Sequence, residues 1–164
     1  MVTLWKIVNQ MNLEYFINHI IGYHEWSIPP NMRDTLFDIP LIGTGVSQEQ
    51  VSSIQSHGEF PIDPEYCEFI RKYGYVVIGE KMELCGIGNG ISSPWFSDKH
   101  KSNESFWVLG DFSQFGDGDQ LLQTKDNRYI LYLHENGPEF RHIGNNFTEL
   151  LKYIISITNP LTHS

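Results

Sequence analysis

The sequence predicts an α+β fold in which a largely antiparallel sheet of about five to six strands is flanked by N- and C-terminal helices. Three observations support this prediction. Three segments between residues 12 and 74 have helical patterns, short strand-like runs cluster between 75 and 134, and an amphipathic helix follows. Strands that cluster, instead of alternating with helices, are typical of α+β proteins. The 164 residues fit a single domain over 1–164.

The first predicted helix starts after Asn12, which is a suitable N-cap. The apolar residues after it have the i, i+3, i+4, i+7 and i+8 spacing of one helical face: Leu13, Phe16, Ile17, Ile20 and Ile21. We expect this helix to end at Gly22, because glycine commonly follows a helix C-terminus. Three prolines interrupt residues 23–45, which should form an ordered connection within the same domain because they also carry many apolar residues.

Two further helices have clear N-terminal patterns. Ser47 and Gln50 have the spacing of a capping box, and the helix that they begin should end at Gly58. Asp63 precedes Pro64, and proline is favoured at the first position of a helix because its missing N–H would be unpaired there anyway.

The hydrophobic pattern changes after Gly74, where the third helix should end. Apolar runs at 75–78 and 82–87 flank residues 79–81 and predict a β-hairpin. Residues 88–105 are rich in glycine, serine, asparagine and lysine, so we expect a surface loop. The hairpin therefore precedes a long connection to the remaining strands.

Three more strands are predicted in the second half of the chain, at 106–109, 120–124 and 129–134. The first two are separated by a glycine-rich turn region at 111–118. The last two are joined by four residues, and such short connections favour antiparallel pairing.

A final helix is predicted at the C-terminal side. Asn146 and Glu149 form a capping pair, and the residues that follow give a complete amphipathic stripe: Phe147, Leu150, Leu151, Ile154 and Ile155. This helix should close the domain against the sheet.

Composition excludes several function classes. Twenty acidic residues against 11 basic ones give a formal net charge of -9, whereas a general nucleic-acid binder needs a basic surface. No stretch approaches the roughly 18 apolar residues of a membrane span. The two cysteines, Cys67 and Cys85, are expected to be buried thiols, which suits a reducing cytoplasm. We therefore expect a cytoplasmic protein that binds neither nucleic acid nor membrane directly.

Four ordered motifs resemble those of one known family. Residues 62–74 resemble its proline, Tyr, Phe-Leu and glycine-turn pattern, and Gly118-Asp119 before an apolar pair resembles its Gly-Asp strand. Residues 129–135 resemble the next strand, and residues 143–151 are similar to the closing motif. The closing motif has Gly144, Asn146 and Leu150 where the family usually has Ala, Ser and Phe, and each replacement keeps its physical role.

The family that carries these motifs is the SUKH superfamily, which includes Smi/Knr-type cell-wall regulators and bacterial immunity proteins. The resemblance covers residues 46–157. It implies a non-enzymatic protein, without a cofactor, that neutralises a cognate toxin, such as a nuclease, by stoichiometric binding. The alternative that it leaves open is a regulatory protein-interaction module similar to the cell-wall synthesis regulators. We expect a monomer or a weak dimer.

The candidate chemical sites in the sequence lack supporting motifs. A metal site at His134 and His142 would need further ligands, and neither cysteine lies in a nucleophile motif. The aspartates around 111–119 lack EF-hand spacing, and residues 86–90 lack the Lys-Ser/Thr pair of a phosphate loop. We expect no catalytic residue and no metal, although a small hydrolase or transferase with a site formed only in the fold stays open.

The candidate partner-binding residues are acidic and aromatic. The acidic ones lie near predicted turns and strand ends, where they could steer a basic partner: Glu80, Glu83, Asp111, Asp117 and Asp119. The aromatic candidates are Trp95 and Phe96, because large aromatic residues in loops can anchor interfaces. Trp107 alternates within a strand and is expected in the core instead.

Overall fold

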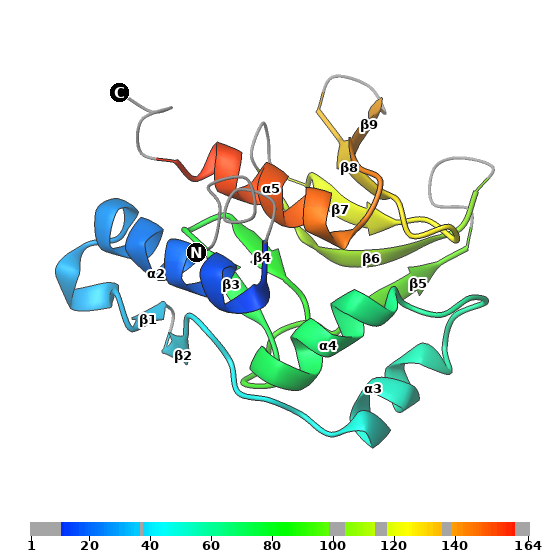
Figure 1. Ribbon diagram of the computed structural model, residues 1–164, viewed down its shortest axis with the longest axis horizontal. Coiled ribbons are helices and arrows are strands. Elements are labelled where there is room, and N and C mark those ends of the chain that lie inside the picture. The colour runs from blue at the N-terminus through cyan, green and yellow to red at the C-terminus, as the bar shows by residue number, and fades with distance from the viewer. Residues whose placement is uncertain (1–10, 37, 99–103, 114–117, 136–138, 160–164) are drawn as a thin grey trace, which may run out of the picture.

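A computed structural model describes residues 11–36, 38–98, 104–113, 118–135 and 139–159 and has the predicted α+β architecture (Figure 1). Its helices are α2 (Leu13–Ser27), the 3-10 turn η1 (Pro30–Met32), α3 (Gln48–Gln55), α4 (Pro64–Tyr73) and α5 (Phe147–Ile157). Its strands are β1 (Thr35–Leu36), β2 (Ile39–Pro40), β3 (Val76–Ile78), β4 (Met82–Leu84), β5 (Trp95–Ser97), β6 (Phe106–Asp111), β7 (Gln120–Gln123), β8 (Tyr129–Leu133) and β9 (Glu139–Gly144).

The main sheet has five strands in the order β5-β6-β7-β8-β9, and every neighbouring pair is antiparallel. Two small hairpins, β1–β2 and β3–β4, form separate two-stranded sheets. The N-terminal helix α2 and the C-terminal helix α5 pack together, and α5 also contacts the edge strand β9 (Figure 1). The sheet, the helices and both hairpins thus belong to one domain.

The largest hydrophobic core lies between the helices and one face of the main sheet. Trp107 and Leu131 of the sheet are fully buried there, together with Phe16 of α2, Phe69 of α4 and Leu150 of α5. The Trp107 indole also donates a hydrogen bond from Nε1 to the Phe60 carbonyl at 2.8 Å. Trp107 is therefore a core residue, as the alternation of its strand predicts.

The opposite face of the main sheet forms a second, smaller core. The Phe106 ring on β6 and the Phe140 ring on β9 stack with centroids 5.9 Å apart, although two strands lie between theirs. Strands in a flat sheet are spaced about 4.8 Å apart, so β6 and β9 would be about 14 Å apart. The two rings therefore lie much closer together than their strands would in a flat sheet, and Val108, Leu122 and Tyr132 are buried on the same face.

A buried polar network fixes α4 to the main sheet. Asp63 caps α4 by accepting a hydrogen bond from the Glu65 N–H, and its second carboxylate oxygen accepts one from the Tyr129 hydroxyl at 2.6 Å. The Asp63 N–H donates to the Gln123 side-chain oxygen at 2.9 Å. These bonds satisfy groups that would otherwise be costly to bury.

All four predicted helix caps are confirmed. Asn12, Ser47, Asp63 and Asn146 each accept a hydrogen bond from a backbone N–H in the first turn of their helix. Their geometry depends only on neighbouring residues, which is why the sequence predicts it well.

The predicted end of the first helix at Gly22 is wrong, because α2 continues to Ser27. Gly22 faces open space, so it imposes no packing defect. The added turn buries His24, whose Nε2 donates to the Val77 carbonyl at 2.7 Å. An internal glycine such as Gly22 costs a helix about 1 kcal/mol. The bond from His24 to β3 favours the extra helical turn despite this cost.

Two strands of the main sheet were not predicted. β5 lies inside the expected loop at 88–105 and is only three residues long, so it shows no period in the sequence. β9 is an edge strand whose Glu139, Arg141 and His142 are exposed, and such polar edges lack the apolar alternation of a buried strand.

Candidate functional site

The β3–β4 hairpin forms because an apolar strand meets a tight turn. All three residues of β3 are buried, and the chain reverses at Gly79, whose φ of 65° lies in the left-handed region that favours glycine. The antiparallel register places Val77 opposite Glu83. The confirmed hairpin thus presents Glu83 beside an apolar neighbour.

Contacts between β4 and β6 bring the end of β6 beside the hairpin. The Cys85 N–H donates to the Leu109 carbonyl at 2.6 Å, and Met82 forms an isolated antiparallel bridge with Phe112. Gly110 lies so close to the Glu83 carbonyl that a Cβ would not fit between them. This close approach brings Asp111, the last residue of β6, next to the hairpin.

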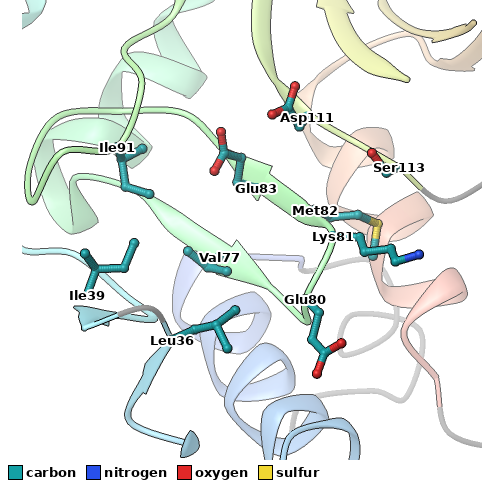
Figure 2. Close-up of a pocket in the computed structure, with 10 residues that line it drawn as sticks. All are labelled: Leu36, Ile39, Val77, Glu80, Lys81, Met82, Glu83, Ile91, Asp111 and Ser113. Carbon is teal, nitrogen blue, oxygen red and sulfur yellow. The ribbon is translucent and has the colours of Figure 1, made fainter. Parts of the chain in front are cut away.

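A groove of about 310 Å³ runs along this hairpin (Figure 2), and we call it the acidic groove. Its lining residues are Leu36, Ile39, Val77, Glu80, Lys81, Met82, Glu83, Ile91, Asp111 and Ser113. Figure 2 shows Glu83 and Asp111 toward one end, Leu36 and Ile39 toward the other, and Glu80 and Lys81 at the hairpin turn. The groove therefore has an acidic end at Glu83 and Asp111, whereas Glu80 lies away from them at the hairpin turn.

Negative charge predominates in the acidic groove, because three carboxylates face a single lysine. Burial raises the pKa of Glu83; the hydrogen bond that Cys85 Sγ donates to its Oε1 at 3.5 Å lowers it, and the negative charge of Asp111 raises it further. Within the described part of the chain, the side chains of Glu80 and Asp111 have no hydrogen bond and no ion-pair partner. The groove thus carries a negative charge that the fold leaves largely uncompensated.

The two aromatic candidates lie elsewhere, on β5, and do not line the acidic groove. Phe96 is half-buried and packs edge-on against Trp107 and Phe60, with ring centroids 5.4 Å and 5.1 Å away. Trp95 is 44% exposed and pairs with Val108 of β6, on the other face of the sheet. Phe96 therefore serves the core, and Trp95 is a surface residue apart from the groove.

The two remaining acidic candidates do not join the acidic groove. Asp119 is only 1% exposed, and its Oδ1 accepts a hydrogen bond from the His134 N–H at 2.9 Å. A buried aspartate cannot contact a partner, so the expectation that Asp119 lies on the binding surface is corrected. Asp117 lies outside the described residues.

The apolar wall of the groove was not predicted from the sequence. Leu36 and Ile39 come from the β1–β2 hairpin, and Ile91 comes from the connection before β5. The sequence predicts the segments that carry these three residues, 23–45 and 88–105, only as connections. The apolar residues within 23–45 gave the one indication, namely that this segment must pack on the domain.

Both cysteines are buried, as predicted. Burial raises the pKa of the Cys67 thiol to about 11, and it raises that of Cys85 as well, so neither is a ready nucleophile at neutral pH. Among the described residues, no group of three or more His, Cys, Asp or Glu side chains is placed to hold a metal ion. In the same parts of the chain, no helix has the length and apolar character needed to cross a bilayer.

Comparison with known proteins assigns nothing further to this site. No protein-family model, curated protein or solved structure matches the chain. The resemblance to the SUKH superfamily therefore stays a prediction from the motifs, and the acidic groove is interpreted from its own geometry and charge.

Proposed function

We propose that this chain is a non-enzymatic immunity protein of the SUKH type that binds a basic cognate toxin in the cytoplasm of the producing cell. The single observation that carries the proposal is the gathering of Glu80, Glu83 and Asp111 in one groove that also offers apolar contact area. Among the described residues, Glu80 and Asp111 have no hydrogen bond or ion pair and Glu83 accepts only the bond from Cys85 Sγ, so these carboxylates are available to a partner. The apolar wall beside them supplies the burial that a stable complex needs.

Charge would act mainly on the encounter between the two proteins. With a net charge of -9 and a negative groove, the chain attracts a basic surface over distances of about a Debye length. Once docked, the chain would cover the active site of the toxin and exclude its substrate. This mechanism needs no cofactor and no bond-making by the immunity protein.

Co-expression with the toxic protein encoded beside its gene tests the proposal. Cells should survive when the wild-type chain is present, and the two proteins should co-elute as a stoichiometric complex. Cell death in the presence of soluble chain would overturn the proposal. An adjoining gene whose product is harmless but binds the chain tightly would instead favour the regulatory interaction module.

A pair of charge-matched variants ties the protection to the groove. The double variant Glu83→Gln/Asp111→Asn removes two negative charges from the groove, and Glu49→Gln/Glu68→Gln removes two from exposed positions on α3 and α4. Loss of protection with the first pair but not the second supports the groove as the contact surface. Equal protection by both pairs would place the contact elsewhere.

A further inference from the structure

We propose that the acidic groove is a receptor for a single arginine side chain of the partner, with the guanidinium between Glu83 and Asp111 and the aliphatic stem along Val77 and Ile91. This inference rests on the proposed function and names the chemical group that the groove recognises. The groove volume of about 310 Å³ is at the lower limit of ligand pockets, which suits one side chain better than a cofactor.

The apolar part of the groove matches the stem of such a side chain. Val77 and Leu36 are buried at its base, and Ile39 and Ile91 are half-buried, so they retain surface for an incoming group to cover. Basic side chains bury their methylene stems along apolar surface while the charged end stays at a polar site. In Figure 2 this wall leads toward Glu83. An arginine whose stem lies along the wall would therefore place its guanidinium near Glu83.

The acidic end of the groove favours a guanidinium over other cations. Glu83 and Asp111 come from different strands and lie close enough for the charge of Asp111 to act on Glu83. A planar guanidinium has five N–H donors and can serve two carboxylates at once, and it is more weakly hydrated than an ammonium group. Lys81, the one basic lining residue, is exposed at the hairpin turn and forms no ion pair with a described residue.

Titration with a small analogue of the side chain tests the inference without any partner. Butylguanidinium carries the stem and the charge, and butylurea is its neutral counterpart. In ¹H–¹⁵N correlation spectra, butylguanidinium should shift the amides of residues 77–83, 91 and 110–113 in a saturable manner with millimolar affinity. Butylurea should leave them unchanged.

Variants assign the binding to the two carboxylates. Glu83→Gln and Asp111→Asn should each weaken butylguanidinium binding by about fivefold, while the matched surface variant Glu49→Gln should bind as the wild type does. The same spectra report whether each variant is folded. Shifts that are not saturable, that butylurea reproduces, or that persist unchanged in both groove variants would overturn the inference.

The two proposals fail in different ways. If butylguanidinium binds as expected but co-expression gives no protection, the arginine receptor stands and the immunity function fails. If co-expression protects and the analogue does not bind, the immunity function stands and the receptor fails. A protective complex in which lysine substitution of every partner arginine leaves the affinity unchanged would also overturn the receptor.

Discussion

Asp63 at the start of α4 and Glu83 in the acidic groove are carboxylates in different surroundings, since Asp63 is buried and Glu83 is half-buried. Asp63 is 5% exposed and accepts hydrogen bonds from the Glu65 N–H and the Tyr129 hydroxyl. Among the described residues, Glu83 accepts only a weak thiol bond from Cys85, and it faces the negative charge of Asp111. A carboxylate that stabilises a fold has hydrogen-bond donors within that fold, as Asp63 does. Glu83 has only a weak donor among the described residues, so it is the better candidate for binding a partner.

Substitution of Asp63 should have the largest effect on stability. Asp63→Ala removes an N-cap, worth about 1 kcal/mol, and leaves the buried Tyr129 hydroxyl without its partner, which costs about 1–3 kcal/mol. We expect urea denaturation to show a decrease of about 2–4 kcal/mol in the free energy of unfolding.

A double-mutant cycle sharpens this expectation. Because the Asp63 and Tyr129 side chains share one hydrogen bond, Asp63→Ala and Tyr129→Phe should cost less together than the sum of their separate effects. Strict additivity of the two changes would show that the bond contributes nothing, and the contrast between Asp63 and Glu83 would then lose its basis.

Asp119→Ala should have the next largest effect, and the effect should be on folding alone. The substitution removes the hydrogen bond that the Asp119 carboxylate accepts from the His134 N–H, and because His134 is exposed we expect only the net cost of one hydrogen bond, about 0.5–1.5 kcal/mol in the free energy of unfolding. Thermal or urea unfolding measures it. If the folded variant also loses affinity for the toxin, Asp119 belongs with the groove after all.

The sequence predicts the parts of the fold that depend on local geometry. The helix caps at Asn12, Ser47 and Asn146 need only the next few residues, and so does the turn at Gly79. The strand β9 could not be predicted, because it owes its place to pairing with β8 and contact with α5 rather than to its own pattern.

The acidic groove was predictable only in part for the same reason. Glu80 and Glu83 flank a recognisable hairpin turn, whereas Leu36 reaches the groove from a segment about 45 residues earlier in the chain. Asp119 follows a glycine turn, a pattern typical of an exposed residue, but in the fold it is buried and accepts a hydrogen bond from the N–H of His134, which lies 15 residues later. Partners distant in the sequence decide both outcomes.

Glu83→Gln should change stability in the opposite direction from Asp63→Ala. Burial and the neighbouring Asp111 raise the pKa of Glu83 above its ordinary value of 4.5, so the folded state disfavours the charged form. We expect a gain of less than about 1 kcal/mol in the free energy of unfolding at pH 7, since water screens a half-exposed carboxylate.

The pH dependence of this gain follows from the sign of the shift. Just above pH 4.5 the folded protein binds a proton at Glu83 more tightly than the unfolded chain does, so the free energy of unfolding falls as pH rises through that window. In Glu83→Gln this contribution should disappear. A variant that is less stable than the wild type at pH 7 would contradict the contrast with Asp63.

Glu80→Gln should have the smallest effect on stability and should act on association instead. Glu80 is exposed at the hairpin turn, so the free energy of unfolding should change by no more than about 0.5 kcal/mol, as it should for the control Glu49→Gln. Stopped-flow mixing with the toxin at low salt should show slower association for Glu80→Gln only, with dissociation unchanged, because a charge at the rim of a contact acts mainly on encounter. At high salt the difference should vanish, since ions screen exposed charges. If Glu80→Gln and Glu49→Gln slow association equally, the net charge of the whole chain attracts the partner and the groove has no special part in the encounter.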